Sequence, residues 1–255
     1  MKSGGQKIIG VIPARYASTR FPGKPLALIH GREMLAWVIE GVQKSRSLQE
    51  IYVATDDLRI AELAKREGAQ VVMTDSNLPS GTDRVWAAVE KMDCDVIINI
   101  QGDEPLVQSV TIDSLVKVLL ENSDLEMATL AHPISAEELH SLNAVKVVTD
   151  QLGRALYFSR FPIPYSRDNA KHSEFSGCLK HIGMYGYRKS FLKQFCSAPQ
   201  AEIEKAESLE QLRALSLGAK IQVVKVKEAS FGVDVPEDIQ KVENLLKNLG
   251  KSSIR

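Results

Sequence analysis

The segment DVIINIQGDEP, residues 95–105, joins a strongly apolar run to a polar turn. Residues 95–100 are apolar enough for a strand buried on both faces, as the central strands of parallel sheets are. The turn that follows carries Asp103, where a buried strand meets solvent. Ligands of open α/β sheets bind outside the carboxyl ends of the strands. The segment therefore predicts a parallel sheet with a candidate binding residue at its edge.

The first half of the chain surrounds this strand with alternating strand and helix patterns. Apolar β-rich runs occur at 7–12, 51–55 and 71–74, and each precedes a helix pattern with one apolar face. Asp56 and Asp57 can cap the second helix, and Gly68 can end it. This alternation predicts βαβ units and a mostly parallel sheet.

The second half departs from that pattern. Ser135 and Glu138 form a capping box, and a turn at 150–153 between two strand patterns predicts a hairpin. Further predictions are a strand at 181–187, one helix at 201–217, a strand at 221–226 and a final helix with Pro236 in its first position. We expect one compact α/β unit, with a core at 1–130 and 220–255 and an α+β insertion at 131–219.

Composition excludes several classes of protein. The 255 residues carry 32 basic and 32 acidic side chains, whereas a general binder of nucleic acids or membrane surfaces needs a strongly basic face. The three cysteines are widely spaced and form no CxxC pair, which argues against a disulfide framework or a zinc site. No apolar run approaches the roughly 18 residues of a membrane span. We expect a cytoplasmic protein.

The zero net charge is an average over unlike segments. Residues 1–32 carry a net charge of +6, and residues 154–193 again carry +6. The rest of the chain is correspondingly acidic. Local positive charge of this kind favours two small-anion sites over one extended basic surface.

The loop after the first strand, residues 13–25, concentrates part of that charge. It contains Arg15, Ser18 and Lys24, and it fits neither a Walker loop nor a GxGxxG fingerprint. Guanidinium and ammonium groups beside backbone donors suit a polyphosphate. The alternative is a solvated basic loop.

Two carboxylates follow predicted strands. Asp103 follows the central strand, and Asp234 lies between the last strand and the last helix. Together they could hold Mg²⁺, which takes only one or two protein carboxylates. Alternatively, Asp103 is a turn residue and Asp234 a helix N-cap.

Two further candidates have equally ordinary alternatives. The segment from Ser80 to Arg84 could bind a ligand at a helix N-terminus or could simply cap that helix. His181 lies in a strand pattern near other polar residues and could meet an anionic substrate. A lone histidine near a core is more often a structural residue.

These segments fall in the order of motifs in one family. The motifs are IPAR (12–15), STR (18–20), PGKPL (22–26), ATDD (54–57), SGTDR (80–84), QGDEP (101–105), VKVV (145–148), YFSR (157–160), KHIG (180–183), LEQLR (209–213) and GVD (232–234). The chain resembles the 3-deoxy-manno-octulosonate cytidylyltransferase (CMP-Kdo synthetase) family over essentially its whole length.

The resemblance implies a Rossmann-like nucleotidyltransferase that joins CTP to the acidic sugar Kdo for lipopolysaccharide synthesis, and a cytoplasmic homodimer. It implies triphosphate contacts by Arg15 and Lys24, magnesium on Asp103 and Asp234, and catalytic roles for these four residues. The implied nucleotide site also includes Pro13, Ala14, Ser18, Ser80, Arg84 and Gln101. The implied sugar site, in the insertion with the dimer interface, consists of Arg160, His181, Tyr185, Glu210 and Gln211.

The chain departs from the family pattern at two places. Ser141 to Ala144 replace the usual Asn/Asp-Pro-Asn segment, and Val235 replaces a threonine. Both changes concern local loop geometry and the preferred sugar. Two other functions stay open: a cytidylyltransferase for a related amino-substituted or nine-carbon acidic sugar, and a nucleotide-binding module without catalysis.

Overall fold

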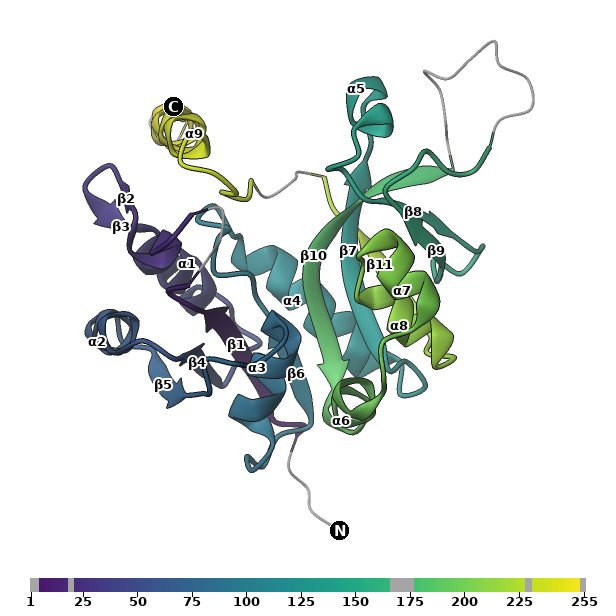
Figure 1. Ribbon diagram of the computed structural model, residues 1–255, viewed down its shortest axis with the longest axis horizontal. Helices are drawn as coiled ribbons and strands as arrows, with labels where there is room; N and C mark the ends of the chain where they lie inside the picture. Colours follow the sequence, from purple (N-terminus) through teal and green to yellow (C-terminus); the bar gives the residue numbers. More distant parts are fainter. Residues whose placement is uncertain (1–4, 18–20, 166–176, 228–230, 253–255) are drawn as a thin grey trace. The chain divides into compact units, whose positions relative to one another are not determined.

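The computed structural model describes residues 5–17, 21–165, 177–227 and 231–252 (Figure 1). The chain divides into two compact units: unit 1 contains residues 1–113 and 230–255, and unit 2 contains residues 114–229. The boundary falls within helix α4 (Ser109–Glu121).

Unit 1 is built on four parallel strands in the order β6 (Val96–Asn99), β1 (Ile8–Ala14), β4 (Glu50–Thr55) and β5 (Gln70–Met73). β1 lies between β6 and β4, and its Val11 is opposite both Asn99 and Tyr52. All four residues of β6 are buried, which explains its continuous apolar sequence. The carboxyl ends of β1 and β6 therefore meet at one edge of the sheet.

The helices of unit 1 are α1 (Met34–Gln43), α2 (Leu58–Arg66), α3 (Gly81–Val89) and α9 (Asp238–Ser252). Unit 1 also contains the short 3₁₀ helix η1 (Lys24–Leu26) and the strand pair β2 (Leu28–Ile29) and β3 (Arg32–Glu33). The predicted limits of α2 are confirmed. The Asp57 side chain accepts a hydrogen bond from the Arg59 amide, and Gly68 follows the helix with φ +81°.

Unit 2 combines parallel and antiparallel pairs. β7 (Met127–Pro133) pairs in parallel with β11 (Ile221–Lys225) and antiparallel with β10 (Cys178–Arg188). β8 (Lys146–Thr149) pairs with β10 and with β9 (Ala155–Ser159). The predicted hairpin is confirmed: Gly153 has φ +77°, and its amide donates to the Asp150 carbonyl.

The helices of unit 2 are α5 (Ala136–His140), α6 (Lys189–Ser197), α7 (Glu202–Glu207) and α8 (Gln211–Ser216). The predicted capping box of α5 is present. The prediction of one helix over 201–217 is wrong, because the chain turns left-handed at Ser208, with φ +53°, and separates α7 from α8. α6 was not predicted from the sequence.

The start of the last helix is also corrected. α9 begins at Asp238 rather than at Pro236, which lies in the preceding turn. The reason is a local hydrogen-bonding arrangement: Asp238 Oδ2 accepts from the amides of Asp234 and Val235. Asp238 thus closes the turn that carries the candidate carboxylate Asp234.

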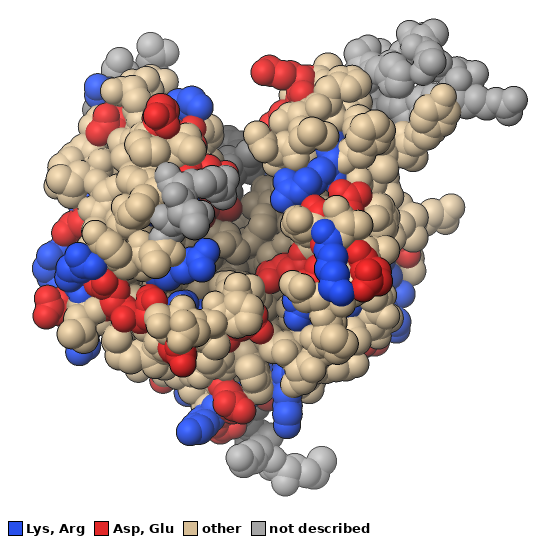
Figure 2. Space-filling model, viewed as in Figure 1, with Lys and Arg blue, Asp and Glu red and all other residues tan. Residues whose placement is uncertain are grey.

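The fold is α/β with mixed, mostly parallel strand pairing, as expected from the alternating patterns. On the face shown in Figure 2, basic and acidic side chains are interspersed rather than gathered into one basic surface. Within the described ranges, no helix is long and apolar enough to cross a membrane.

Candidate active site

The site begins where the loop after β6 passes the end of β1. A Cβ atom on Gly102 would lie 3.0 Å from the Pro13 carbonyl oxygen, which is closer than ordinary contact allows. Glycine therefore lets the two backbones approach closely. This contact brings the loop at 101–103 beside the loop that starts at Arg15.

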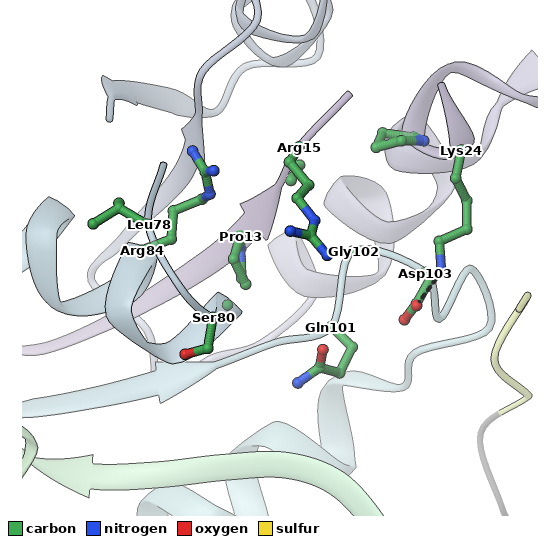
Figure 3. Close-up of a pocket in the computed structure, with 12 residues that line it drawn as sticks. Pro13, Arg15, Lys24, Leu78, Ser80, Arg84, Gln101, Gly102 and Asp103 are labelled. Atoms are coloured by element: carbon green, nitrogen blue, oxygen red, sulfur yellow. Dashed lines mark hydrogen bonds and ion pairs between the residues drawn. The ribbon is translucent and has the colours of Figure 1, made fainter. Parts of the chain in front are cut away.

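A pocket of about 250 Å³ lies at this edge (Figure 3). It is lined by Pro13, Ala14, Arg15, Lys24, Pro25, Leu78, Ser80, Gly81, Arg84, Gln101, Gly102 and Asp103, all in unit 1. The structure thus brings together the candidate nucleotide-binding residues with the exception of Ser18, which lies outside the described residues.

Lys24 and Asp103 form an ion pair at one side of the pocket (Figure 3). Lys24 Nζ donates to Asp103 Oδ2 at 2.5 Å and to the Val233 carbonyl at 2.9 Å. Lys24 is placed by η1, which starts after Gly23, a residue with φ +71°. The candidate triphosphate cation and the candidate metal ligand therefore neutralise each other.

Asp234 is held near Asp103 by the backbone of its neighbour Val233. The Val233 amide donates to the Asp103 carbonyl at 2.9 Å, and Val233 is buried. Asp234 itself is exposed and stands directly after this anchored residue. The backbone links between 103 and 233 thus hold both carboxylate-bearing loops at one side of unit 1.

The donors at this position fit a hard cation. A carboxylate and backbone carbonyls are the oxygen ligands that Mg²⁺ takes, and the Lys24 ammonium now binds two of them as a stand-in cation. The described residues contain no group of three or more acidic, histidine or cysteine side chains suited to a metal. Mg²⁺ does not need one, since it keeps several waters and substrate oxygens.

The opposite side of the pocket is formed by Ser80, which precedes α3, and by Arg84 of α3 (Figure 3). Ser80 Oγ accepts from the Asp83 amide, so Ser80 caps α3 and lines the pocket as well. Arg84 is buried, donates to Thr74 Oγ1 at 2.5 Å and lies 3.7 Å from Asp56 Oδ1. Burial lowers the Arg84 pKa, Asp56 opposes that shift, and Arg15 adds to it.

Three candidate sugar residues lie together in unit 2. His181 and Tyr185, on β10, have ring centroids 5.5 Å apart, and the Tyr185 hydroxyl donates to Gln211 Oε1 at 3.3 Å. Gln211 Nε2 is buried and has no hydrogen-bond partner among the described residues. Glu210 directly precedes α8, which starts at Gln211. Buried polar groups in proteins usually have a hydrogen-bond partner. The amide nitrogen of Gln211 would therefore gain one from a polar ligand bound here.

His181 is neutral in this structure. Burial lowers its pKa to about 3, so His181 would meet an anionic substrate as a neutral hydrogen-bonding group rather than as a cation. Thr129 Oγ1 has one hydrogen, which it donates to a backbone carbonyl at Ile182 or Met184. The 2.9 Å contact between Thr129 Oγ1 and His181 Nε2 therefore has the imidazole as donor. Nδ1 is left as the acceptor.

Arg160 is held by a separate network. Its Nε donates to the Glu207 carbonyl at 2.9 Å, and its backbone amide donates to Glu207 Oε2 at 2.9 Å. The fully buried Lys146 donates to the carbonyls of Arg160, Ser141 and Ala144. Burial lowers the Lys146 pKa. The network orients the one cation among the candidate sugar residues.

Backbone hydrogen bonds explain how the two departures from the family pattern are accommodated. Lys146 binds backbone carbonyls in the segment 141–144, so the altered side chains there remove no acceptor. Val235 likewise acts through its backbone, because its amide donates to Asp238 Oδ2 and its carbonyl accepts from the Asp238 amide.

Several residues at the pocket were not predicted from the sequence. Pro25, Leu78, Gly81 and Gly102 line it, and Asp56 pairs with Arg84. Gly81, Gly102 and Asp56 lie inside segments already singled out as motifs. These residues lie after a predicted strand or at the start of a predicted helix, and that position could have identified them as candidate site residues. Leu78 carries no comparable signal, since its place depends on how the loop before α3 folds back.

Open α/β sheets bind nucleotides at the carboxyl ends of their strands, and the cationic pocket of this chain lies at that edge. A family model described as cytidylyltransferase matches residues 9–221. A Bdellovibrio bacteriovorus protein described as 3-deoxy-manno-octulosonate cytidylyltransferase is 60% identical over 96% of this chain and 99% of its own. A Geobacter sulfurreducens protein with the same description is 45% identical over 94% of this chain and 99% of its own.

A solved structure described as CMP:2-keto-3-deoxy-manno-octonic acid synthetase complexed with CTP has a TM-score of 0.90. It is 40% identical, over 95% of this chain and 99% of that one. The chain belongs to the family of 3-deoxy-manno-octulosonate cytidylyltransferases.

Proposed function

We propose that this chain transfers CMP from CTP to the anomeric 2-hydroxyl of 3-deoxy-D-manno-octulosonate, giving CMP-Kdo and pyrophosphate. The observation that carries the proposal is the pocket that joins Arg15 and Lys24 to Asp103, in a chain 60% identical to a described enzyme of this activity. The product is an activated sugar for lipopolysaccharide synthesis.

The nucleotide would occupy the pocket of unit 1. Arg15 and Lys24 supply fixed positive charge for the triphosphate, and the loop at 101–103 with Ser80 provides polar groups near the nucleoside. Phosphoryl transfer requires little covalent chemistry from the protein, so positioning and charge neutralisation dominate. Pyrophosphate would leave along Arg15 and Lys24, opposite the attacking hydroxyl.

Asp103 and Asp234 would hold Mg²⁺. When bound, the metal neutralises charge on the phosphate oxygens and lowers the pKa of the attacking hydroxyl. The protein's part is to keep both carboxylates on loops joined through the Val233 backbone.

The sugar would contact residues of unit 2. Arg160 would offset the sugar carboxylate, because it is the cation in the set and its orientation is fixed by Glu207. His181 would accept a hydrogen bond at Nδ1, and Gln211 Nε2 would donate one. Tyr185 and Glu210 complete the proposed sugar site, and Ser18 is proposed for the nucleotide.

We further propose a cytoplasmic homodimer with a Rossmann-like core. The insertion would carry both the sugar contacts and the dimer interface. Five large apolar side chains between residues 142 and 165 are exposed, among them Leu156 at 61% and Phe161 at 70%. Exposed apolar groups gathered in one segment favour an interaction surface there.

Pyrophosphate release tests the function. The protein is incubated with CTP, Mg²⁺ and a panel of acidic sugars: Kdo, 8-amino-Kdo and a nine-carbon acid. Release with Kdo supports the proposal. Release only with another sugar would assign a related cytidylyltransferase, and no release with any sugar would favour a nucleotide-binding module.

A further inference from the structure

Lys24 occupies the cation position on Asp103. Its ammonium contacts Asp103 Oδ2 at 2.5 Å and the Val233 carbonyl at 2.9 Å. The Lys24 side chain is only 16% exposed and that of Asp103 32%, so solvent screens this pair only in part. The contact oxygens are the same kind of oxygens that a divalent cation would use.

The two cations cannot share this position without a large electrostatic cost. A metal ion bound to Asp103 Oδ2 would stand within a few ångströms of the ammonium, where like charges in a partly buried site repel each other. The same ammonium lines the pocket together with Arg15, where anionic phosphate would attract it. The nucleotide and the carboxylate therefore compete for Lys24.

We propose that Lys24 is an exchangeable internal cation: it neutralises Asp103 in the free protein and moves to the triphosphate when the nucleotide binds, which opens Asp103 to the divalent metal. This exchange makes nucleotide and metal binding mutually favourable, because each removes an obstacle to the other. It rests on the proposed nucleotide and metal sites, and it adds an order of events to them.

The exchange also acts on the loop that carries the second carboxylate, Asp234. Lys24 Nζ binds the Val233 carbonyl, and Asp234 is the next residue. When Lys24 leaves, the Val233 amide still donates to the Asp103 carbonyl, so the loop stays attached while its carbonyl is released. One movement of the lysine thus frees oxygen atoms on both loops.

The test measures Mn²⁺ binding to nucleotide-free protein by electron paramagnetic resonance of the free ion. Lys24→Met should bind Mn²⁺ about tenfold more tightly than the unaltered protein, as expected for removing one partly screened neighbouring charge. The matched control is Lys44→Met, which removes an exposed lysine of unit 1 paired with Glu40. It should leave Mn²⁺ affinity unchanged.

The double variant Lys24→Met/Asp103→Asn should lose the added affinity, which assigns the gain to Asp103. Equal or weaker Mn²⁺ binding in Lys24→Met would overturn the exchange. If Lys24→Met does not fold, Lys24→Gln is measured with the same expectation. Neither CTP nor sugar is present, so the result is independent of whether the protein releases pyrophosphate with Kdo.

Discussion

Asp103 accepts a hydrogen bond from Lys24 and lies beside the backbone that leads to Asp234. Its position after the buried strand β6 was predictable from the sequence, since a short apolar run followed by Gly-Asp marks a strand end. Its pairing with Lys24 was not predictable, because these residues are 79 positions apart. Only the folded sheet shows that the two loops meet.

We predict that Asp103→Asn lowers turnover by about 10²-fold or more, because a lost metal ligand weakens charge stabilisation in the transition state. Folding should be intact, since Asn has nearly the same shape. Steady-state pyrophosphate release with Kdo and saturating Mg²⁺ measures the effect. Asp93→Asn, at an exposed position, is the control. Near-normal turnover of Asp103→Asn would contradict its assigned role.

His181 gives a prediction on pH. Its pKa is about 3 in the folded protein and near 6.5 when unfolded, so between these values the unfolded chain binds more protons. The free energy of unfolding should therefore fall as pH is lowered from 6.5 toward 3, by at most about 1.4 kcal/mol per pH unit from this residue.

Urea unfolding at several pH values compares the unaltered protein with His181→Gln. Below pH 6.5, the free energy of unfolding should decrease less steeply in the variant than in the unaltered protein. This difference is expected whatever the stability of the variant at neutral pH. An identical pH dependence in both proteins would show that His181 is not held neutral by burial.

Elements of regular pattern were the easiest to predict. The four parallel strands of unit 1, the limits of α2 and the hairpin of β8 and β9 each follow from local sequence. The break between α7 and α8 was missed, because a left-handed serine at 208 carries no glycine or proline signal. Glu204 of α7 and Arg213 of α8 pair across that break, with Nη2 to Oε1 at 2.6 Å and Nε to Oε2 at 2.8 Å.

We predict that Glu204→Gln destabilises the protein by about 3 kcal/mol, because it leaves the buried Arg213 guanidinium without its counter-ion. Chemical unfolding measures this change. Glu202→Gln is a matched control on the same helix, since Glu202 is 88% exposed and pairs with Lys205 at the surface. That variant should leave stability nearly unchanged, because exposed ion pairs contribute little. Equal effects of both substitutions would argue against a structural role for the buried pair.

The balance of charge over the whole molecule agrees with a small-anion site. Part of the positive charge of residues 1–32 lies at the pocket, in Arg15 and Lys24. From the sequence, the order of motifs was sufficient to identify the family and to suggest the site residues. Whether those residues line one pocket depends on tertiary contacts such as Gly102 against Pro13, which no local pattern encodes.

The proposed homodimer gives a prediction at this scale. Sedimentation equilibrium should show a dimer for the unaltered protein and a monomer for Leu156→Lys/Phe161→Lys, because buried charge would oppose association through these side chains. Leu58→Lys is the control, since Leu58 is 71% exposed in unit 1. A monomeric unaltered protein, or equal dissociation by the control, would contradict the proposed interface.

The central claim is the transfer of CMP to Kdo, and ³¹P nuclear magnetic resonance of the reaction mixture tests it most directly. With CTP, Kdo and Mg²⁺, we predict that the three CTP signals disappear as one phosphodiester signal and pyrophosphate appear in equal amounts. Consumption of CTP without a phosphodiester signal, or no consumption while Kdo is present, would contradict the claim.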